Sequence, residues 1–231
     1  MTGAPARDFA AERAALLVEV DRTYAETRAE TGLAAMSPAV RAAMGRVERH
    51  RLVPPAVVDA AYRNHPLPIG GGQTISQPYI VALSTDLVAP RPDHVVLEVG
   101  TGSGYQAAVL AELVSRVYSI ELLPELGRNA AAKLAELGYR NVEVRIGDGY
   151  AGWPERAPFD AIVVTAAAPA VPPALVAQLK PGGRMVIPVG GDGEIQFLLL
   201  LQKAADGSVS ERRVLPVRFV PLVPGDAPGR R

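Results

Sequence analysis

The stretch VVLEVGTGSGY, residues 95–105, decides how this chain folds. It begins with a short apolar run rich in β-branched side chains, which is typical of a strand buried in a parallel sheet. Three glycines follow at alternate positions, and residues 106–113 (QAAVLAEL) then have helical spacing and good helix formers. A strand, a glycine turn and a helix in this order open a nucleotide-binding βαβ unit.

The spacing of Gly100, Gly102 and Gly104 indicates the kind of ligand. A dinucleotide-binding turn has the pattern G-x-G-x-x-G, because the pyrophosphate lies on the helix N-terminus. This turn is G-x-G-x-G, with Glu98 before it and no Lys or Arg near it to meet a phosphate. The pattern favours a ligand with a nucleoside and no phosphate, such as S-adenosylmethionine. The alternative is a tight strand-to-helix turn that binds nothing.

The composition limits the class of protein. With 231 residues, of which 48% are hydrophobic, the chain is long enough for one domain with a full core. Lys plus Arg and Asp plus Glu number 24 each, and zero net charge argues against a nucleic-acid-binding protein. The absence of cysteine excludes disulfides, thiol nucleophiles and cysteine zinc sites. The three histidines have no metal-ligand spacing, so we expect no metal.

The sequence contains no recognisable targeting or membrane segment. The N-terminus, MTGAPARD, is polar and lacks the apolar core of a signal peptide. No apolar run approaches the length of a membrane span. We therefore expect a cytoplasmic protein that does not bind membranes.

Strands and helices alternate after residue 95. We predict helices over residues 124–137 and 173–179, a turn at residues 180–183, and strands at residues 117–121, 142–146, 159–165, 184–189, 196–203 and 212–222. This order predicts an α/β fold with a doubly wound, mostly parallel sheet and an antiparallel edge.

The region before the sheet is predicted to be helical. Helices are expected at residues 9–32, from Ser37 to residue 47, and at residues 56–62. Two prolines and three glycines in residues 64–72 predict a shaped loop rather than a regular element. We expect a single domain over residues 1–231, with a helical extension (1–65), a cofactor and substrate core (66–223) and a tail (224–231). The extension either covers one edge of the domain, closes over the site or pairs two chains.

Polar side chains gather at three further places. Residues 73–79 (QTISQPY) lead into a helix, so their hydroxyls either cap that helix or face a substrate. Glu121 ends a strand, where a carboxylate in such folds binds the two ribose hydroxyls, although a surface glutamate is the alternative. Asp148, between Gly147 and Gly149, either accepts a hydrogen bond from an adenine amino group or holds its own turn.

Two of these stretches resemble known sequences. Residues 97–105 (LEVGTGSGY) resemble the first motif of class I methyltransferases that depend on S-adenosylmethionine. Residues 66–79 (PLPIGGGQTISQPY) closely resemble the signature loop of protein-L-isoaspartate (D-aspartate) O-methyltransferases. Residues 147–149, 159–166, 179–190 and 218–222 agree with the same family, so the resemblance covers roughly residues 35–223. Tyr79 stands where some members have His, and the helix before Ser37 is longer than in the shortest members.

The resemblance implies a Rossmann-like fold, S-adenosylmethionine as cofactor, no metal, and isoaspartyl-containing proteins as partners rather than nucleic acids or membranes. The implied reaction is methyl transfer to the free α-carboxyl of L-isoaspartyl or D-aspartyl residues in damaged proteins, which initiates their repair. The resemblance implies Ser76 as the catalytic residue. It implies cofactor binding by Gln73, Thr74, Ile75, Glu98, Gly100, Thr101, Gly102, Ser103, Glu121, Gly147, Asp148 and Gly149, and substrate binding by Ser76, Tyr79, Thr165 and Ala166.

This chemistry needs no general base. The α-carboxyl, with an ordinary pKa of about 3.5, is already an anion at neutral pH. Ser76 is therefore expected to orient the carboxylate rather than to act as a nucleophile, since its neighbourhood shows no triad partner. Two alternatives remain open: a methyltransferase acting on a small molecule or nucleic acid, and a non-catalytic module that binds S-adenosylmethionine. A nicotinamide-dependent oxidoreductase is disfavoured by the glycine spacing.

Overall fold

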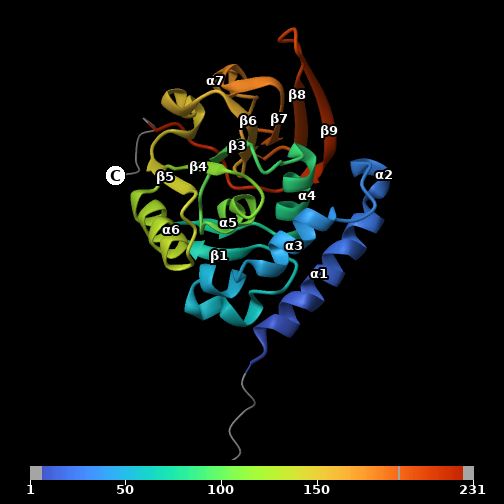
Figure 1. Cartoon of the computed structure of the whole chain (residues 1–231), viewed down its shortest axis with the longest axis vertical. Helices are drawn as coiled ribbons and strands as arrows, with labels where there is room; N and C mark the ends of the chain where they lie inside the picture. Colours follow the sequence, from blue (N-terminus) through green and yellow to red (C-terminus); the bar gives the residue numbers. More distant parts are fainter. Residues whose placement is uncertain (1–6, 192, 226–231) are drawn as a thin grey trace, which may run out of the picture.

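A seven-stranded sheet forms the centre of the molecule (Figure 1). The computed structural model describes residues 7–191 and 193–225. Strand order is β5-β4-β3-β6-β7-β8-β9, and pairing is parallel from β5 to β7 and antiparallel from β7 to β9. The strands are β3 (Val95–Val99), β4 (Arg116–Glu121), β5 (Val142–Ile146), β6 (Phe159–Val164), β7 (Leu179–Val189), β8 (Gln196–Lys203) and β9 (Val209–Val217). The predicted doubly wound, mostly parallel sheet with an antiparallel edge is confirmed.

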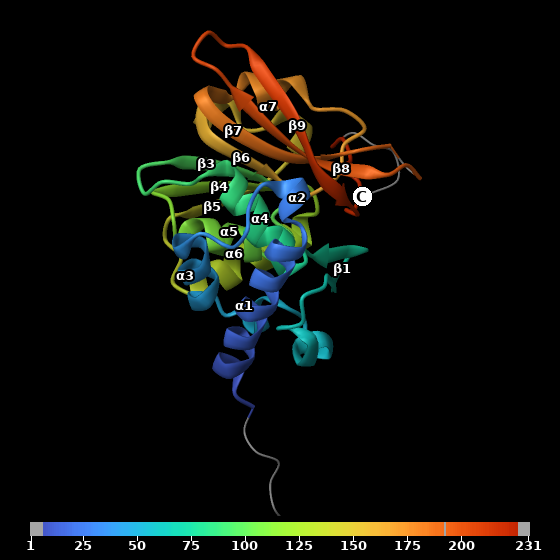
Figure 2. The same cartoon turned by 90° about the vertical axis from the view of Figure 1, so that its right-hand side faces the viewer.

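Helices cover both faces of this sheet (Figure 2). One face packs against α4 (Pro78–Val88), α5 (Tyr105–Ala111) and α6 (Pro124–Glu136), and the other against α7 (Pro173–Ala177) and the short turns η3 (Gly149–Ala151) and η4 (Pro154–Arg156). Alternate residues of β3 enter the two cores: Val96 lies in the first, and Leu97 and Val99 in the second. Both faces of the central strands are therefore buried, as their apolar sequences predict.

The N-terminal region is helical, as predicted, but two elements differ. The expected helix at residues 9–32 is divided at Thr27, whose hydroxyl donates to the Thr23 carbonyl at 2.9 Å and also contacts the Tyr79 hydroxyl. Such bonding by a threonine back to the preceding turn bends a helix. The expected helix at residues 56–62 is a 3-10 turn that begins at a proline. The elements are α1 (Phe9–Glu26), α2 (Arg28–Thr31), α3 (Pro38–Arg46), η1 (Arg49–Leu52) and η2 (Pro55–Ala60).

Two stretches predicted to be irregular belong to strands. The predicted loop at residues 64–72 was wrong in part, because β1 (Leu67–Gly70) and β2 (Gln73–Ile75) form an antiparallel hairpin. Its turn residues, Gly70, Gly71 and Gly72, have φ values of +92°, +59° and +72°, and glycine adopts this region without steric cost. The predicted turn at residues 180–183 is a bulge within β7, where the pairing with β6 shifts.

Polar contacts fasten the N-terminal helices to the sheet domain. The Tyr24 hydroxyl of α1 donates to the Asp86 carboxylate of α4 at 2.7 Å, and the Ser37 N–H donates to the same oxygen at 3.3 Å. Arg212 of β9 donates to the Glu30 and Thr31 carbonyls at the end of α2, at 3.3 and 3.4 Å. In Figure 2, α1 and α2 accordingly run beside α4 and reach β9. Within the described part of the chain, no helix is both long and apolar enough to cross a membrane.

Tyr24→Phe should lower the free energy of unfolding, because it removes a buried hydrogen bond to a charged carboxylate. Such a bond contributes about 1.5–3 kcal/mol, and Tyr24 is 0% exposed. Urea denaturation of the full chain should show one transition at a lower midpoint. Tyr118→Phe is the matched control, since the Tyr118 hydroxyl has no hydrogen bond to any residue that the structure describes. Equal midpoints for the two variants would show that the Tyr24–Asp86 bond does not anchor α1.

Candidate active site

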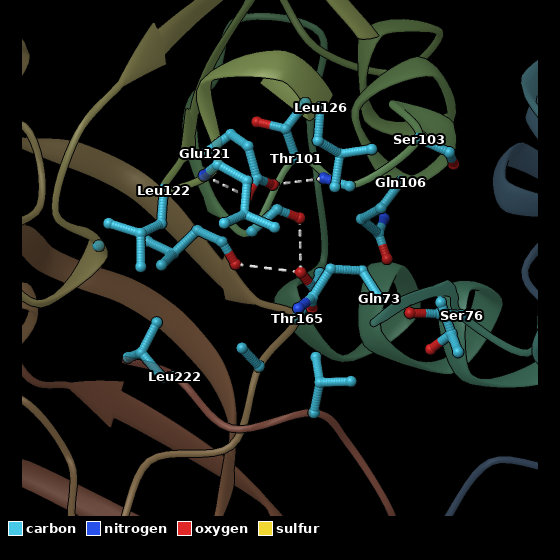
Figure 3. Close-up of a pocket in the computed structure, with 18 of the residues that line it drawn as sticks. Gln73, Ser76, Thr101, Ser103, Gln106, Glu121, Leu122, Leu126, Thr165 and Leu222 are labelled. Atoms are coloured by element: carbon cyan, nitrogen blue, oxygen red, sulfur yellow. Dashed lines mark hydrogen bonds between the residues drawn. The ribbon is translucent and has the colours of Figure 1, made fainter. Parts of the chain in front are cut away.

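A cleft lies at the carboxyl ends of β3, β4 and β6 (Figure 3). Strand β3 pairs with β4 on one side and β6 on the other, so the strand order reverses here, and ligands of doubly wound sheets bind at such a point. The cleft is open to solvent on one side and is lined by polar and apolar side chains together, as small-molecule sites are. Among the expected residues, its lining contains Gln73, Thr74, Ile75, Ser76, Gly100, Thr101, Gly102, Ser103, Glu121, Gly149, Thr165 and Ala166.

The glycine turn is pressed against the end of β6. Gly100 has φ +97°, and a Cβ added to it would lie 2.3 Å from the Thr165 hydroxyl oxygen. That hydroxyl donates to the Gly100 carbonyl at 2.6 Å and lies 3.1 Å from the Val99 carbonyl. Only glycine allows this approach. The Thr165 hydroxyl, predicted to bind substrate, therefore lines the cleft with its proton already engaged.

Glu121 organises the same turn from β4. Its two carboxylate oxygens accept hydrogen bonds from the Gly102 N–H at 2.8 Å and the Leu123 N–H at 3.0 Å. The side chain is buried, yet it lines the cleft, where Figure 3 shows it beside Thr101. The predicted ribose-binding carboxylate is thus held rigidly by backbone donors, and its role towards a ribose stays a prediction.

Glu98 does not line the cleft but lies beneath it. Its carboxylate is fully buried and accepts a hydrogen bond from the Ser119 hydroxyl, which is 2.6 Å from the Thr101 hydroxyl on the cleft wall. Burial raises the pKa of Glu98 to about 8, and the nearby Glu121 carboxylate adds to this rise. Any effect of Glu98 on a ligand must pass through these neighbours.

Gly147 and Asp148 also lie outside the cleft lining. Asp148 accepts a hydrogen bond from the Tyr150 N–H at 2.8 Å and so holds the start of η3. This is the turn-holding alternative that the sequence allowed, and the adenine contact stays a prediction. The following residue, Gly149, does line the cleft, and a Cβ there would lie 2.5 Å from Val99.

A second groove meets the cleft at Ser76. It encloses about 1450 Å³, part of it solvent, and shares Thr74, Ser76, Thr165 and Val220 with the cleft. Its other walls come from α1, α2 and the residue between them, from the start of α4, and from the end of β9 and the segment after it. These residues are Thr23, Thr27, Glu30, Pro66, Gln77, Tyr79, Ile80, Leu215, Pro216, Val217, Arg218 and Phe219. Among the described residues, none makes a hydrogen bond to the Ser76 hydroxyl, which is therefore available to a ligand.

Sequence analysis missed the residues that close the cleft opposite the glycine turn. Residues 220–223 line it, and backbone hydrogen bonds join them to the loop after β6: Ala167 N–H to the Val220 carbonyl at 2.8 Å and Leu222 N–H to the Ala167 carbonyl at 2.7 Å. The 218–222 stretch supported the family resemblance, but no local signal placed it at a site. Also missed were Val81, Val99, Tyr105, Gln106, Ile120, Leu122, Leu123 and Leu126, of which Leu122 could have been suspected from its place after Glu121.

The chemistry of the lining limits the ligand. Glu121 is the single Asp, Glu, Lys, Arg or His among the lining residues, and the rest carry hydroxyl, amide or apolar groups. With no Lys or Arg in the lining, the cleft is unsuited to a phosphate but suited to a nucleoside or a cation. The structure groups no three His, Cys, Asp or Glu residues as a metal site within residues 7–191 and 193–225.

Comparisons with known sequences point to one family. A family model described as Protein-L-isoaspartate(D-aspartate) O-methyltransferase (PCMT) matches residues 25–227. A Cupriavidus necator protein named protein-L-isoaspartate O-methyltransferase 1 is 58% identical over 215 residues, which are 93% of this chain and 83% of that protein. A Nitrosospira multiformis protein of the same name is 60% identical over 197 residues, covering 85% of this chain and 84% of that protein.

Solved structures agree on the fold. A protein-L-isoaspartate O-methyltransferase structure has a TM-score of 0.79 and 28% identity, covering 92% of this chain and 66% of that one. A Plasmodium falciparum structure, titled a putative enzyme of the same name in complex with S-adenosyl-L-homocysteine, has a TM-score of 0.72. At 24% identity, covering 90% of this chain and 98% of that one, it supports the fold alone.

Gly100→Ala should destabilise the protein more than a matched glycine substitution. A positive φ costs a non-glycine residue about 1–2 kcal/mol, and the clash with Thr165 should add about 1–3 kcal/mol. Gly182→Ala is the control, because Gly182 has φ +81° but nothing within 4 Å of an added Cβ. Free energies of unfolding in urea should separate the two variants. An equal loss would mean that the close contact with Thr165 is unimportant.

Proposed function

The chain belongs to the protein-L-isoaspartate(D-aspartate) O-methyltransferase family, and we propose that it transfers a methyl group from S-adenosylmethionine to the free α-carboxyl of L-isoaspartyl or D-aspartyl residues in damaged proteins. The observation that carries this proposal is the position of Ser76, Thr74 and Thr165 on both the cleft and the groove. A donor in the cleft and a peptide in the groove would meet there.

The cleft fits the methyl donor. The glycine turn lets a ligand approach the backbone, Glu121 offers carboxylate oxygens to ribose hydroxyls, and Leu122 and Leu126 offer apolar surface to an adenine. We assign donor binding to the predicted residues that line the cleft: Gln73, Thr74, Ile75, Gly100, Thr101, Gly102, Ser103, Glu121 and Gly149. Glu98, Gly147 and Asp148 support them from outside the lining. When bound, S-adenosylmethionine supplies a methyl group already activated by its sulfonium.

Ser76 orients the acceptor. Its free hydroxyl donates a hydrogen bond to one oxygen of the acceptor carboxylate and leaves the other oxygen to accept the methyl group. No residue has to remove a proton, because the carboxyl is ionised at neutral pH. Val220 and Leu222 cover the cleft and keep water from the reacting atoms. Tyr79, Thr165 and Ala166 frame the peptide beside Ser76.

The groove fits a peptide better than a nucleic acid. Among the described residues that line the groove, two are charged, Glu30 and Arg218, and their charges are opposite. A nucleic acid would need several cations to neutralise its phosphates. Thr23 of α1, Thr27 between α1 and α2, and Glu30 of α2 form one of its walls. We therefore propose that the N-terminal extension forms one domain with the core and takes part in acceptor binding.

Methyl transfer from labelled S-adenosylmethionine to a synthetic isoaspartyl peptide tests the function directly. The aspartyl twin of the same sequence is the control. We expect base-labile methyl ester on the isoaspartyl peptide only, because the acceptor is the free α-carboxyl. Ester on neither peptide, with donor binding shown by calorimetry, would contradict the proposed acceptor. Ester on both would contradict the specificity for isoaspartyl residues.

Ser76→Ala should lower kcat by about 10- to 100-fold, the equivalent of a hydrogen bond to a charged group. Donor affinity measured by calorimetry should change little, because the hydroxyl serves the acceptor. Ser84→Ala, on the helix α4 that follows Ser76 but outside both cavities, is the control and should keep the wild-type kcat. A wild-type kcat in Ser76→Ala would remove the orienting role.

A further inference from the structure

Glu98 is an acid buried under the cleft without a cation. It lies on β3, on the face that packs against α4 and α5, and is 0% exposed. One carboxyl oxygen accepts a hydrogen bond from the Ser119 hydroxyl. The other oxygen makes no hydrogen bond to a described residue, although the backbone N–H of Ala107 at the start of α5 favours the ionised carboxyl. The sheet does not need an acid at this position, since the apolar residue Val96 fills the same face of the same strand.

Two hydroxyls connect this acid to the cleft. Ser119 lies opposite Glu98 in the β3–β4 register, and its oxygen is 2.6 Å from the Thr101 oxygen. Thr101 lines the cleft next to the glycines. The chain Glu98–Ser119–Thr101 therefore leads from the interior to the ligand, and hydroxyl groups can pass a proton along it because each both donates and accepts.

The surroundings favour the uncharged form of Glu98. The ionisable groups on the elements packed around it are Glu121, Tyr118 and Arg116 on β4, Asp160 on β6, Tyr105 on α5, and Tyr79 and Asp86 on α4. Tyr118 packs in the core on the other face of the sheet, and the buried Arg49 guanidinium lies over the Tyr105 ring. Arg116 and Asp160 pair with the opposite end of β3, and Asp86 is bonded to Tyr24. The charged group that affects the pKa of Glu98 is the acid Glu121, which raises it. Burial without a cation raises the pKa of Glu98 to about 8.

We propose that Glu98 is a neutral acid in the ligand-free protein and releases its proton when the positively charged methyl donor binds in the cleft. The inference rests on the proposed donor but not on the proposed acceptor. The sulfonium brings a positive charge to a site of low dielectric, which stabilises the carboxylate and lowers its pKa. The proton leaves through Ser119 and Thr101 to the buffer.

The charge on Glu98 would then make the protein bind the donor more tightly than its product. Once the methyl group has moved, the sulfur of S-adenosylhomocysteine is neutral, so the carboxylate loses its partner and takes a proton back from solvent. Glu98 is in this sense a positioning residue that acts through Ser119 and Thr101. It stabilises the donor complex above the product complex and so favours exchange of product for fresh donor.

Calorimetric titration of the full chain in two buffers of different ionisation enthalpy counts the protons. At pH 7 we expect close to one proton released per S-adenosylmethionine bound and none per S-adenosylhomocysteine. Release should fall towards zero above about pH 9, and donor affinity should rise by up to about tenfold per pH unit below pH 8, while product affinity stays flat. If the wild-type protein released equal numbers of protons with both ligands, or none with either, this titration alone would overturn the proposal.

Glu98→Gln assigns the proton to its residue. The variant keeps the size of the side chain and copies its neutral form, so it should release no proton and lose about tenfold of the preference for donor over product above pH 8. Glu112→Gln, at a partly exposed carboxylate paired with Arg46, is the control and should behave as wild type. Unchanged proton release in Glu98→Gln would overturn the assignment. Because no acceptor is present, a failure of peptide methylation would leave this result standing, whereas failure of both ligands to bind would refute the donor itself.

Discussion

The contact between the Gly100 carbonyl and the Thr165 hydroxyl, at 2.6 Å, is the constraint on which the site depends. It closes the ends of β3 and β6 against each other at the point where the strand order reverses. A Cβ would not fit between them, and Gly100 has none, so the turn can leave the sheet at this point. Two residues later, the Gly102 N–H donates to the Glu121 carboxylate. The same closure sets Thr165 at the boundary of cleft and groove. A single steric requirement therefore positions the cleft and the groove together.

Local patterns were sufficient to predict most of the central fold. Apolar runs and glycine stops identified β3 to β6, since strands buried on both faces have continuous apolar sequences. The predicted site residues 73–76 and 100–103 meet in one cleft because parallel strands and the segments beside them end at the same edge. The pairing of residues 220–223 with Ala167 was not predictable in this way. It joins segments more than fifty residues apart, and neither sequence carries a signal for the other.

The errors have a common physical origin as well. Residues 64–72 and 180–183 contain the glycines and prolines that usually end regular structure. Residues 67–70 nevertheless pair with β2 in a hairpin, and residues 180–183 form a bulge in β7, whose flanking residues pair with β6. Asp148 is not such an error: one of its oxygens accepts from the Tyr150 N–H two residues later, and the adenine contact stays a prediction. Propensity and spacing predict what a segment can do, and the partner that it meets decides which possibility is realised.

The distribution of charge joins the fold to the chemistry. Methyl transfer from a sulfonium to a carboxylate removes two opposite charges, so fixed charges of high strength near the reacting atoms would stabilise the separated ions and slow the reaction. The cleft avoids this. Its lining acid, Glu121, is held by two backbone N–H groups, and the hydroxyls of Ser76, Thr101 and Thr165 provide direction without net charge. The proposed ionisation of Glu98 serves donor binding rather than the transfer step: the carboxylate attracts the cationic donor from beneath the cleft, outside its lining, and is neutral again once the product has formed.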